Sequence, residues 1–319
     1  MKKFILLLAI SMACFAGCRE DRRAVMRSED DRIHVTTTIF APYDFVRNIA
    51  GDRVNLTMLL PPGSESHSFE PSPRDIITIQ NTDVFIYIGG ESDEWVARIL
   101  ESMDTDTMKI LTLMDMVERL EEEIVEGMED HDHDDHDDDH DHEIVFDEHV
   151  WTSPRNAMAI IQAITEILCE ADSVNADFYR NNAAAYIEAL QELDAAFEAV
   201  IAGAQRRTVV FGDRFPFRYF AHAYGLEYFA AFPGCSTQTE PSVATVAFLI
   251  NKIREEQIPV IFHIELSNER MADTISGETG AQKLLLHSAH NITRRDFDAG
   301  LGFLEIMHRN VDNLREALY

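Results

Sequence analysis

The chain has 319 residues, enough for two domains of ordinary size, and its hydrophobic content of 46% is typical of a folded protein. It carries 57 acidic and 27 basic side chains, which give a formal net charge of −30. This charge argues against nucleic acid and anionic lipid surfaces as electrostatic partners. Net charge alone does not identify a cation-binding protein, because most acidic proteins bind no particular cation.

The N-terminal stretch "MKKFILLLAISMACFAGC" predicts a secretory signal at 1–17, in which two lysines precede a short apolar run. Its ending, "FAGC", resembles a bacterial lipobox, so we expect cleavage before Cys18 and lipid on its thiol; an ordinary signal with a chance cysteine is the alternative. The charged residues 18–31 predict a flexible tether. We therefore expect an extracytoplasmic domain, in the periplasm or at the cell surface, that is held to the membrane by its lipid anchor.

Eight short runs rich in β-branched and apolar residues predict strands. They lie at 33–39, 54–60, 84–89 and 109–113 in the first half of the chain, and at 208–212, 226–232, 259–264 and 283–286 in the second half. Helical patterns separate these runs. The alternation predicts an α/β protein with two similar lobes, each a mainly parallel four-stranded sheet with flanking helices. We place the lobes at 32–173 and 205–319.

The intervening residues 174–204 predict one long α-helix that joins the lobes. Gly203, near its end, is a typical C-terminal stop. A helix over 175–202 is about 42 Å long, which suits a rigid connection. Another helix is expected before it, with Ser153 as N-cap and Pro154 at its first position. The apolar face of the long helix is predicted to contain Phe178, Tyr186, Leu190, Leu193, Phe197 and Val200.

Candidate ligands follow several of the predicted strands. In α/β sheets, ligands bind beyond the carboxyl ends of the strands. His67 lies in a proline-rich loop after the second strand, and Asp213, Glu265 and His287 follow three strands of the second lobe. His149 lies four residues before the expected N-cap. Each residue alone has an ordinary alternative, as a surface histidine or a turn-capping carboxylate.

Three imidazoles and one carboxylate together suit Zn²⁺ and, less selectively, other first-row metals. The sequence contains no G-x-S-x-G elbow, no HExxH and no glycine-rich phosphate loop, so it gives no support for nucleophilic catalysis. Besides Cys18 and Cys14 of the signal, the chain contains Cys169 and Cys235, which are open to a disulfide or to two separate thiols. The remaining histidines are expected to be structural or on the surface: His34, His222, His263, His290 and His308.

Five segments occur in the same order as in a known family: "PPGSESHSFEPSPRD", "DEHVWTSPRNA", "VVFGDRFPFRYFAHAYGL", "EPSVATVAFLINKIREEQIPVIFHIE" and "ISGETGAQKLLLH". The chain resembles the zinc/manganese-binding lipoproteins of bacterial ABC importers over nearly all of its mature length. The resemblance implies two α/β lobes joined by one rigid helix, a metal ion buried between them, and delivery of that ion to a membrane permease. It implies a binding protein and not an enzyme, and we expect a monomer.

The resemblance also implies a ligand set. His67 and His149 match the first two ligands of the family. Asp213 matches the third, which is usually His in zinc members and Glu in manganese members, and His287 matches the fourth, which is often Asp. Glu265 matches a family glutamate near the cleft and is expected to support the ligands or to replace one of them. Three nitrogens and one oxygen favour Zn²⁺ over Mn²⁺ as the transported ion.

The stretch "EDHDHDDHDDDHDHE", at 129–143, holds five histidines and ten acidic residues and predicts a loop inserted in the first lobe. Zinc members of the family often carry such a loop. The resemblance implies weak collection or sensing of zinc there, because ordering a flexible loop costs conformational entropy. A solvating acidic loop is the alternative. The histidines concerned are His131, His133, His136, His140 and His142.

Three other functions remain open at this stage. A manganese or iron importer subunit would favour a site richer in oxygen ligands. A zinc hydrolase would keep an open coordination position for water, which four protein ligands do not leave. A surface adhesin has no support beyond the expected location.

Overall fold

The computed structural model describes residues 32–65, 69–128, 145–236 and 241–319. The expected signal and tether with Cys18, the histidine His67 and the five histidines of 129–143 lie outside these residues. The segment Ile33–Tyr319 forms one compact unit that contains every described helix and strand. In the part of the chain that the structure describes, we find no helix with the length and apolar character that a membrane span requires.

The first sheet is parallel and has the strand order β2-β1-β3-β4. Its strands are β1 (His34–Thr37), β2 (Asn55–Met58), β3 (Val84–Tyr87) and β4 (Lys109–Thr112). The helices between them are α1 (Phe40–Ala50), α2 (Pro73–Gln80) and α3 (Glu94–Glu101), with the 3₁₀ helices η1 (Gly51–Arg53), η2 (Glu91–Asp93) and η3 (Leu113–Met116). All four strands predicted for this half of the chain are confirmed.

The second sheet repeats this topology, with the parallel order β6-β5-β7-β8. Its strands are β5 (Thr208–Phe215), β6 (Glu227–Pro233), β7 (Val260–His263) and β8 (Gln282–Leu285). The accompanying helices are α6 (Arg218–Tyr224), α7 (Val243–Glu256), α8 (Arg270–Thr279), α9 (Arg294–Asp298) and α10 (Phe303–Leu318). The prediction of two similar α/β lobes is therefore confirmed.

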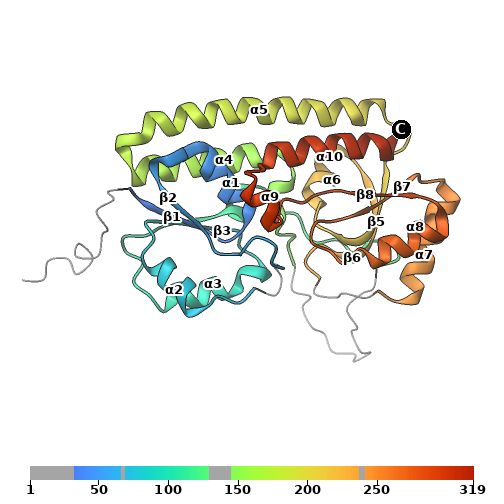
Figure 1. Ribbon diagram of the computed structural model, residues 1–319, viewed down its shortest axis with the longest axis horizontal. Helices are drawn as coiled ribbons and strands as arrows, with labels where there is room; N and C mark the ends of the chain where they lie inside the picture. The colour runs from blue at the N-terminus through green and yellow to red at the C-terminus, as the bar shows by residue number, and fades with distance from the viewer. Residues whose placement is uncertain (1–31, 66–68, 129–144, 237–240) are drawn as a thin grey trace, which may run out of the picture. The chain divides into compact units, whose positions relative to one another are not determined.

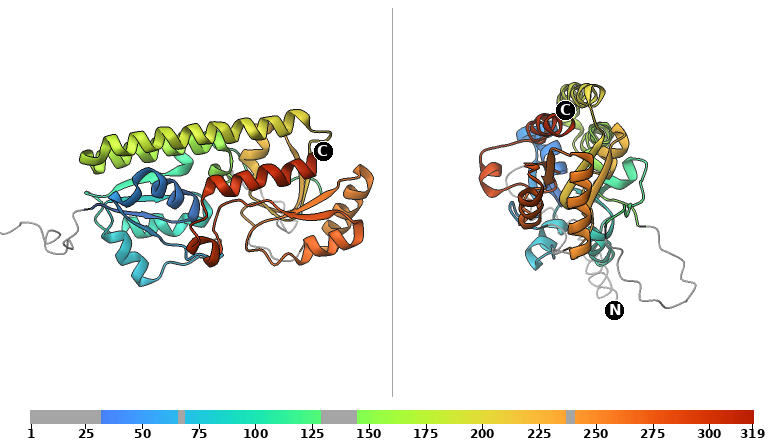
Figure 2. Two further views of the ribbon diagram at one scale, coloured as in Figure 1. Left: turned by 45° about the horizontal axis from the view of Figure 1, so that its top comes forward. Right: turned by 90° about the vertical axis from the view of Figure 1, so that its right-hand side faces the viewer.

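Between the sheets, the chain passes through η4 (Val150–Thr152), α4 (Pro154–Ala171), η5 (Ser173–Asn175) and α5 (Ala176–Gly203). The helix α5 has 28 residues and runs along both sheets, with α10 beside it (Figures 1 and 2). It packs against α1, α4 and α10, so it contacts elements that belong to both halves of the chain. The predicted long connecting helix is thus confirmed.

The buried face of α5 differs from the prediction at one residue. Phe178 is 36% exposed and lies beneath the guanidinium of Arg53, whereas its neighbour Tyr179 is fully buried. From Tyr179, steps of four, three and four residues lead to Ala183, Tyr186 and Leu190, which is the spacing of one helical face. Phe178 lies off this stripe, so its aromatic character misled the prediction.

The core explains why the strands read as continuous apolar runs. One hydrophobic cluster joins the inner faces of both sheets to α5 and α10 and contains Val84, Ile86 and Phe211. Alternate residues point outward into two smaller clusters, Phe85 toward α2 and α3, and Val210 toward α7 and α8. Since both faces of each parallel sheet are covered, neither face needs polar residues.

Candidate metal centre

His149 lies at the start of η4 and is fully buried. Its backbone N–H donates to Asp147 Oδ1 at 2.8 Å, and its ring Nδ1 lies 3.2 Å from the same oxygen. Burial by itself lowers the pKa of His149, but the charge and hydrogen bond of Asp147, together with Glu148 and Glu122, outweigh burial and raise that pKa above its ordinary value. Because acidic side chains surround this imidazole, a cation that binds to it is stabilised by their negative charge.

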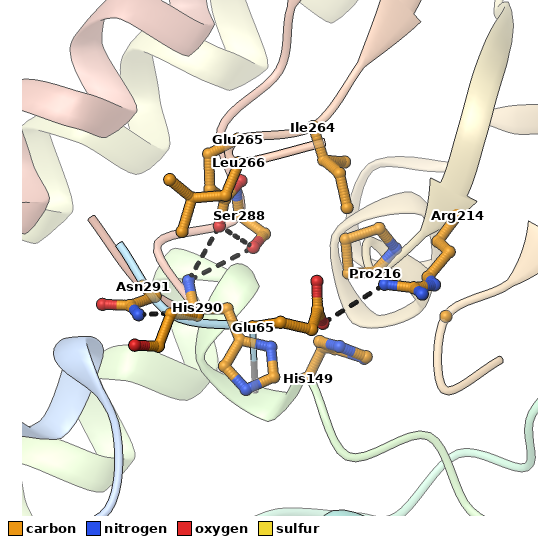
Figure 3. A pocket seen from close by; sticks show the side chains of 12 residues that line it. Glu65, His149, Arg214, Pro216, Ile264, Glu265, Leu266, Ser288, His290 and Asn291 are labelled. Carbon is orange, nitrogen blue, oxygen red and sulfur yellow. Dashed lines mark hydrogen bonds and ion pairs between the residues drawn. The ribbon is translucent and has the colours of Figure 1, made fainter. Parts of the chain in front are cut away.

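The second lobe presents Glu265 and His290 to the same place. Glu265 follows β7, and its carboxylate accepts hydrogen bonds from the backbone and hydroxyl of Ser288, at 2.8 and 2.5 Å, and from the backbone N–H of His290, at 3.1 Å (Figure 3). The rings of His149 and His290 meet edge to face with their centroids 5.4 Å apart. The sheet edges of the two lobes therefore bring an imidazole from each side together.

A small cavity of about 30 Å³ opens between these groups (Figure 3). Its lining comes from both lobes: Ser64, Glu65, His149, Arg214, Pro216, Gly234, Ile264, Glu265, Leu266, Ser288, His290 and Asn291. One water molecule needs roughly 10–15 Å³ measured this way, whereas organic ligands occupy sites of about 300–1,000 Å³. The cavity is thus of a size for an ion and its immediate partners, and far too small for an organic substrate.

An ion pair between Arg214 and Glu65 forms part of the cavity wall. The guanidinium of Arg214 lies 3.3 Å from a carboxylate oxygen of Glu65 (Figure 3). Glu65 belongs to the proline-rich loop that carries His67, so the residues just before His67 reach the cavity wall. The position of His67 itself lies outside the described residues.

Asp213 does not line this cavity. The strand β5 was expected to end at Gly212, but it continues to Phe215, and its pairing with β6 shifts between Phe211 and Arg214. A bulge of this kind re-aims side chains. Here Arg214 lines the cavity, whereas the carboxylate of Asp213 accepts hydrogen bonds from the backbone of Arg214 and Ile264, at 2.9 and 3.3 Å, and lines a neighbouring pocket of about 450 Å³.

His287 lies beside the centre and not among the residues that line the cavity. Its Nδ1 accepts a hydrogen bond from the backbone of Ala289 at 3.0 Å and is 3.5 Å from a carboxylate oxygen of Glu265. The structure therefore brings His149 and Glu265 of the predicted set together. It leaves His287 beside Glu265 and Asp213 in the neighbouring pocket, both outside the lining of the cavity.

Further buried acids surround His149. Glu148 is fully buried and accepts hydrogen bonds from the hydroxyl and the backbone N–H of Ser92. The neighbouring Asp93 is also buried, and its burial together with the charge of Glu148 raises the pKa of Asp93 to about 7. Burial also raises the pKa values of Glu148 and Glu122. So much unbalanced negative charge beside one imidazole is costly without a cation nearby.

Several residues near His149 were not singled out by the sequence patterns. His290 was expected to be structural or on the surface, yet it lines the cavity; the spacing of two histidines in "HSAH", after a strand, is a signal that could have found it. Cys235 lies within 4.8 Å of ligand atoms of Asp147 and His149, and no sequence signal pointed to this meeting. Among the described residues, Cys169 and Cys235 are both free thiols.

Comparisons with known proteins identify the family to which the chain belongs. The family model described as "Zinc-uptake complex component A periplasmic" matches residues 35–317. The chain is 32% identical to the high-affinity zinc uptake system protein ZnuA of Bacillus subtilis over 315 residues, covering 98% of this chain and 97% of that protein. It is also 32% identical to the zinc-binding lipoprotein AdcA of Streptococcus pneumoniae over 318 residues, which are 99% of this chain but 61% of AdcA.

The present chain therefore spans about three fifths of the length of that streptococcal relative. The crystal structure of the Zn(II)-bound ZnuA-like domain of Streptococcus pneumoniae AdcA superposes with a TM-score of 0.74 at 28% identity, over 90% of this chain and 99% of that domain. The likeness extends over both lobes and the connecting helix.

Proposed function

Because the chain belongs to the family of periplasmic zinc-uptake component A proteins, we propose that it is the extracytoplasmic zinc-binding subunit of an ABC importer. In this role it captures the ion between its lobes and delivers it to the permease. Members of this family are metal-binding transport proteins and not enzymes, so no catalytic step is part of the proposal.

The observation that carries the proposal is the cavity at His149. It is of ionic size, it joins donors from both lobes, and buried carboxylates surround it. Zn²⁺ is held in proteins by imidazole, carboxylate and thiolate ligands in tetrahedral sites. A site of pre-placed donors binds one ion tightly, because little conformational freedom is lost on binding.

Within this proposal, His149 is the central ligand, and His67 completes the site from the proline-rich loop that also contains Glu65. For the remaining positions, the geometry favours Glu265 and His290, which line the cavity, over Asp213 and His287. The side chains of Asp213 and His287 instead accept hydrogen bonds from the backbone of neighbouring residues, and His287 Nδ1 lies 3.5 Å from Glu265. Two or three imidazoles favour Zn²⁺, and Mn²⁺, which prefers oxygen ligands, remains the alternative ion.

The remaining parts of the proposal concern residues outside those described. Lipid on Cys18 anchors the protein to the membrane beside its permease. The five histidines of 129–143 bind further zinc ions weakly and so collect zinc for the protein. Both roles are auxiliary, so the cavity is expected to bind zinc without them.

The test is a titration of the purified full chain with Zn²⁺ and with Mn²⁺ in competition with a chelator. The variants are His149→Ala, His290→Ala, Asp213→Ala and a deletion of residues 129–143, and the matched control is His308→Ala, at an exposed position of α10. We expect one tight zinc site that survives the loop deletion and the control. His149→Ala should weaken it by more than about 100-fold, beyond what losing a residue that only supports a ligand costs.

Comparison of the other variants assigns the ligands. A loss in His290→Ala with little change in Asp213→Ala supports the geometry described above, and the reverse result supports the assignment implied by the family pattern. Loss of tight binding on deletion of residues 129–143 would refute the cavity as the transport site.

A further inference from the structure

Arg214 brings a positive charge into a cavity that is otherwise suited to a cation. Among the described residues that line the cavity, it is the one arginine or lysine, and it lies there with the carboxylates of Glu65 and Glu265. A guanidinium is not deprotonated in proteins. Arg214 therefore stays cationic whether or not an ion is bound, and its fixed charge opposes the entry of a cation.

The side chain of Arg214 belongs to a wall between two hollows of the structure. Of the described residues, those that line both the cavity and the neighbouring pocket of about 450 Å³ are Glu65, Arg214 and Leu266. The other charged residues around that pocket are Asp213, Glu269 and Arg270. The guanidinium therefore has beside it a much larger space in which further carboxylates are available as partners.

The backbone at Arg214 is fixed, so a change of position falls to its side chain. Arg214 pairs with Phe232 of β6, and its backbone N–H donates to Asp213 Oδ1 at 2.9 Å. Rotations about the χ angles carry a long side chain from one rotamer to another without moving the backbone. Such rotations are sufficient to take the guanidinium from the cavity to the pocket.

One contact that holds the guanidinium at the cavity is weak. The guanidinium lies 3.3 Å from a carboxylate oxygen of Glu65, and Figure 3 marks this ion pair. The side chain of Arg214 is 13% exposed, whereas that of Glu65 is 46% exposed. An ion pair with one partner half in water contributes little to stability, so separating the two groups costs little.

A bound dication and this guanidinium repel each other. An ion in a cavity of about 30 Å³ lies close to every side chain of the lining, Arg214 included. Even with the screening of bulk water, repulsion between a single charge and a dication about 5 Å apart amounts to roughly tenfold in affinity. The factor is larger in a partly buried site, because the effective dielectric constant is lower there. The ion and the guanidinium therefore compete for the same acidic surroundings.

We propose that Arg214 is a built-in competitor of the transported ion, which lowers the affinity of the site and speeds release. In the metal-free protein its guanidinium pairs with Glu65 and offsets part of the negative charge around His149. When the ion binds, the guanidinium leaves Glu65 and moves into the neighbouring pocket, toward Asp213. Its return to Glu65 accompanies release. The inference rests on the proposed function, which it deepens by naming a residue that sets the affinity and the release rate of that site.

The test is a titration of the purified full chain with Zn²⁺ and with Mn²⁺ in competition with a chelator, together with the rate at which excess chelator removes the ion. The variants are Arg214→Met, which removes the charge but keeps an unbranched side chain, and Arg214→Lys, which keeps the charge. The matched control is Arg218→Met. Arg218 lies 3.2 Å from Glu123, and these two side chains are 23% and 47% exposed, but Arg218 does not line the cavity. Circular dichroism checks the folding of each variant.

We expect Arg214→Met to bind zinc about tenfold more tightly or better, and to release it correspondingly more slowly. Manganese affinity should rise by a similar factor, because the repulsion depends on the charge of the ion and not on its preferred ligands. The rise should be much smaller in Arg214→Lys, and Arg218→Met should change little. An affinity of Arg214→Met that is unchanged or lower overturns the inference, since a residue that only supports the site lowers affinity when it is removed.

A measurement on the wild type keeps the inference testable even where Arg214→Met does not fold. Crystal structures of the metal-free and zinc-loaded protein should show the guanidinium of Arg214 at Glu65 in the first and in the pocket of Asp213 in the second. A guanidinium that remains paired with Glu65 while zinc is bound overturns the inference and leaves the proposed function intact. A wild-type protein that binds no zinc, by contrast, refutes the proposed function itself.

Discussion

Trp151→Phe tests whether the two halves of the centre are held together by one buried indole. Trp151 is fully buried in η4, its Nε1–H donates to the carbonyl oxygen of Ser288 at 2.8 Å, and its ring meets that of His290 edge to face at 5.1 Å. Phenylalanine cannot donate this bond, and an unsatisfied buried carbonyl costs about 1–3 kcal/mol. The smaller ring adds a void worth roughly 1 kcal/mol. We therefore expect the free energy of unfolding to fall by roughly 2–4 kcal/mol, out of a typical total of about 5–15 kcal/mol.

The assay is urea unfolding followed by circular dichroism, together with a zinc titration of the same protein. Zinc affinity should fall by about tenfold, because Ser288 and His290 lose the contact that positions them. Trp95→Phe is the matched control, since Trp95 lies in the separate hydrophobic cluster beneath α2 and α3 and should change stability but not zinc affinity. An unchanged unfolding midpoint in Trp151→Phe would refute the reasoning, as would equal losses of zinc affinity in both variants.

Three further predictions concern the acids and the glycine around His149. Burial and Glu148 raise the pKa of Asp93 from 3.8 to about 7, so the folded state holds a proton that the unfolded state releases, and stability falls as the pH rises from about 4 to about 7. Asp93→Asn should therefore be more stable than the wild type at pH 8, by up to roughly 4 kcal/mol, and should lose most of this advantage at pH 4 in thermal unfolding. The raised pKa of His149 means that zinc must displace a proton near neutral pH, so affinity should fall by about tenfold per pH unit for each protonated imidazole between pH 7 and 5.5; a flat titration would contradict the ligand assignment. Gly234→Ala should lower zinc affinity because its Cβ would press on Asp147 and His149, whereas Gly277→Ala, in open space on α8, should leave affinity unchanged and add about 0.5–1 kcal/mol of stability.

Most of the fold was predictable from local patterns. Parallel strands covered on both faces must be apolar throughout, so runs such as Val84–Tyr87 and Val260–His263 stand out from the surrounding helical patterns. The long helix α5 was predictable because its apolar stripe continues without a break to Gly203. These features depend on residues close in sequence, which is the range over which periodicity carries information.

The candidate site was predictable only in part, because it depends on register and on contacts between distant segments. The sequence singled out Glu265 by its place after a strand and His149 by its place shortly before a predicted helix, and both line the cavity. The bulge in β5, after which Arg214 and not Asp213 lines the cavity, cannot be predicted from the residue pattern, because both residues are polar and adjacent. The approach of Cys235 to His149 joins residues 86 positions apart, and neither residue type signals the other. The placement of His67 remains a prediction.

The contacts around the centre indicate which of its two halves moves when the ion is released. The first-lobe donors are tied down: Asp147 N–H donates to the carbonyl of Leu120 at 3.0 Å, and Thr152 donates to the carbonyl of His149 through both its backbone and its hydroxyl. The second-lobe loops carry strain instead, since Leu266 and Ala289 both have φ values of 59° without being glycine. Each such residue costs about 1–3 kcal/mol of conformational strain, so the free energy of these loops falls when their backbone relaxes.

We therefore expect release to proceed through the second-lobe loops while His149 stays in place. In hydrogen exchange on metal-free protein, the amides of residues 265–269 and 288–291 should exchange faster than those of residues 147–152, and added zinc should slow the first two segments most. The long α5, packed along elements of both halves, opposes a wide opening of the lobes and leaves local loop motion as the route of exit. Faster exchange at residues 147–152 than in the second-lobe loops would show that the first lobe yields instead.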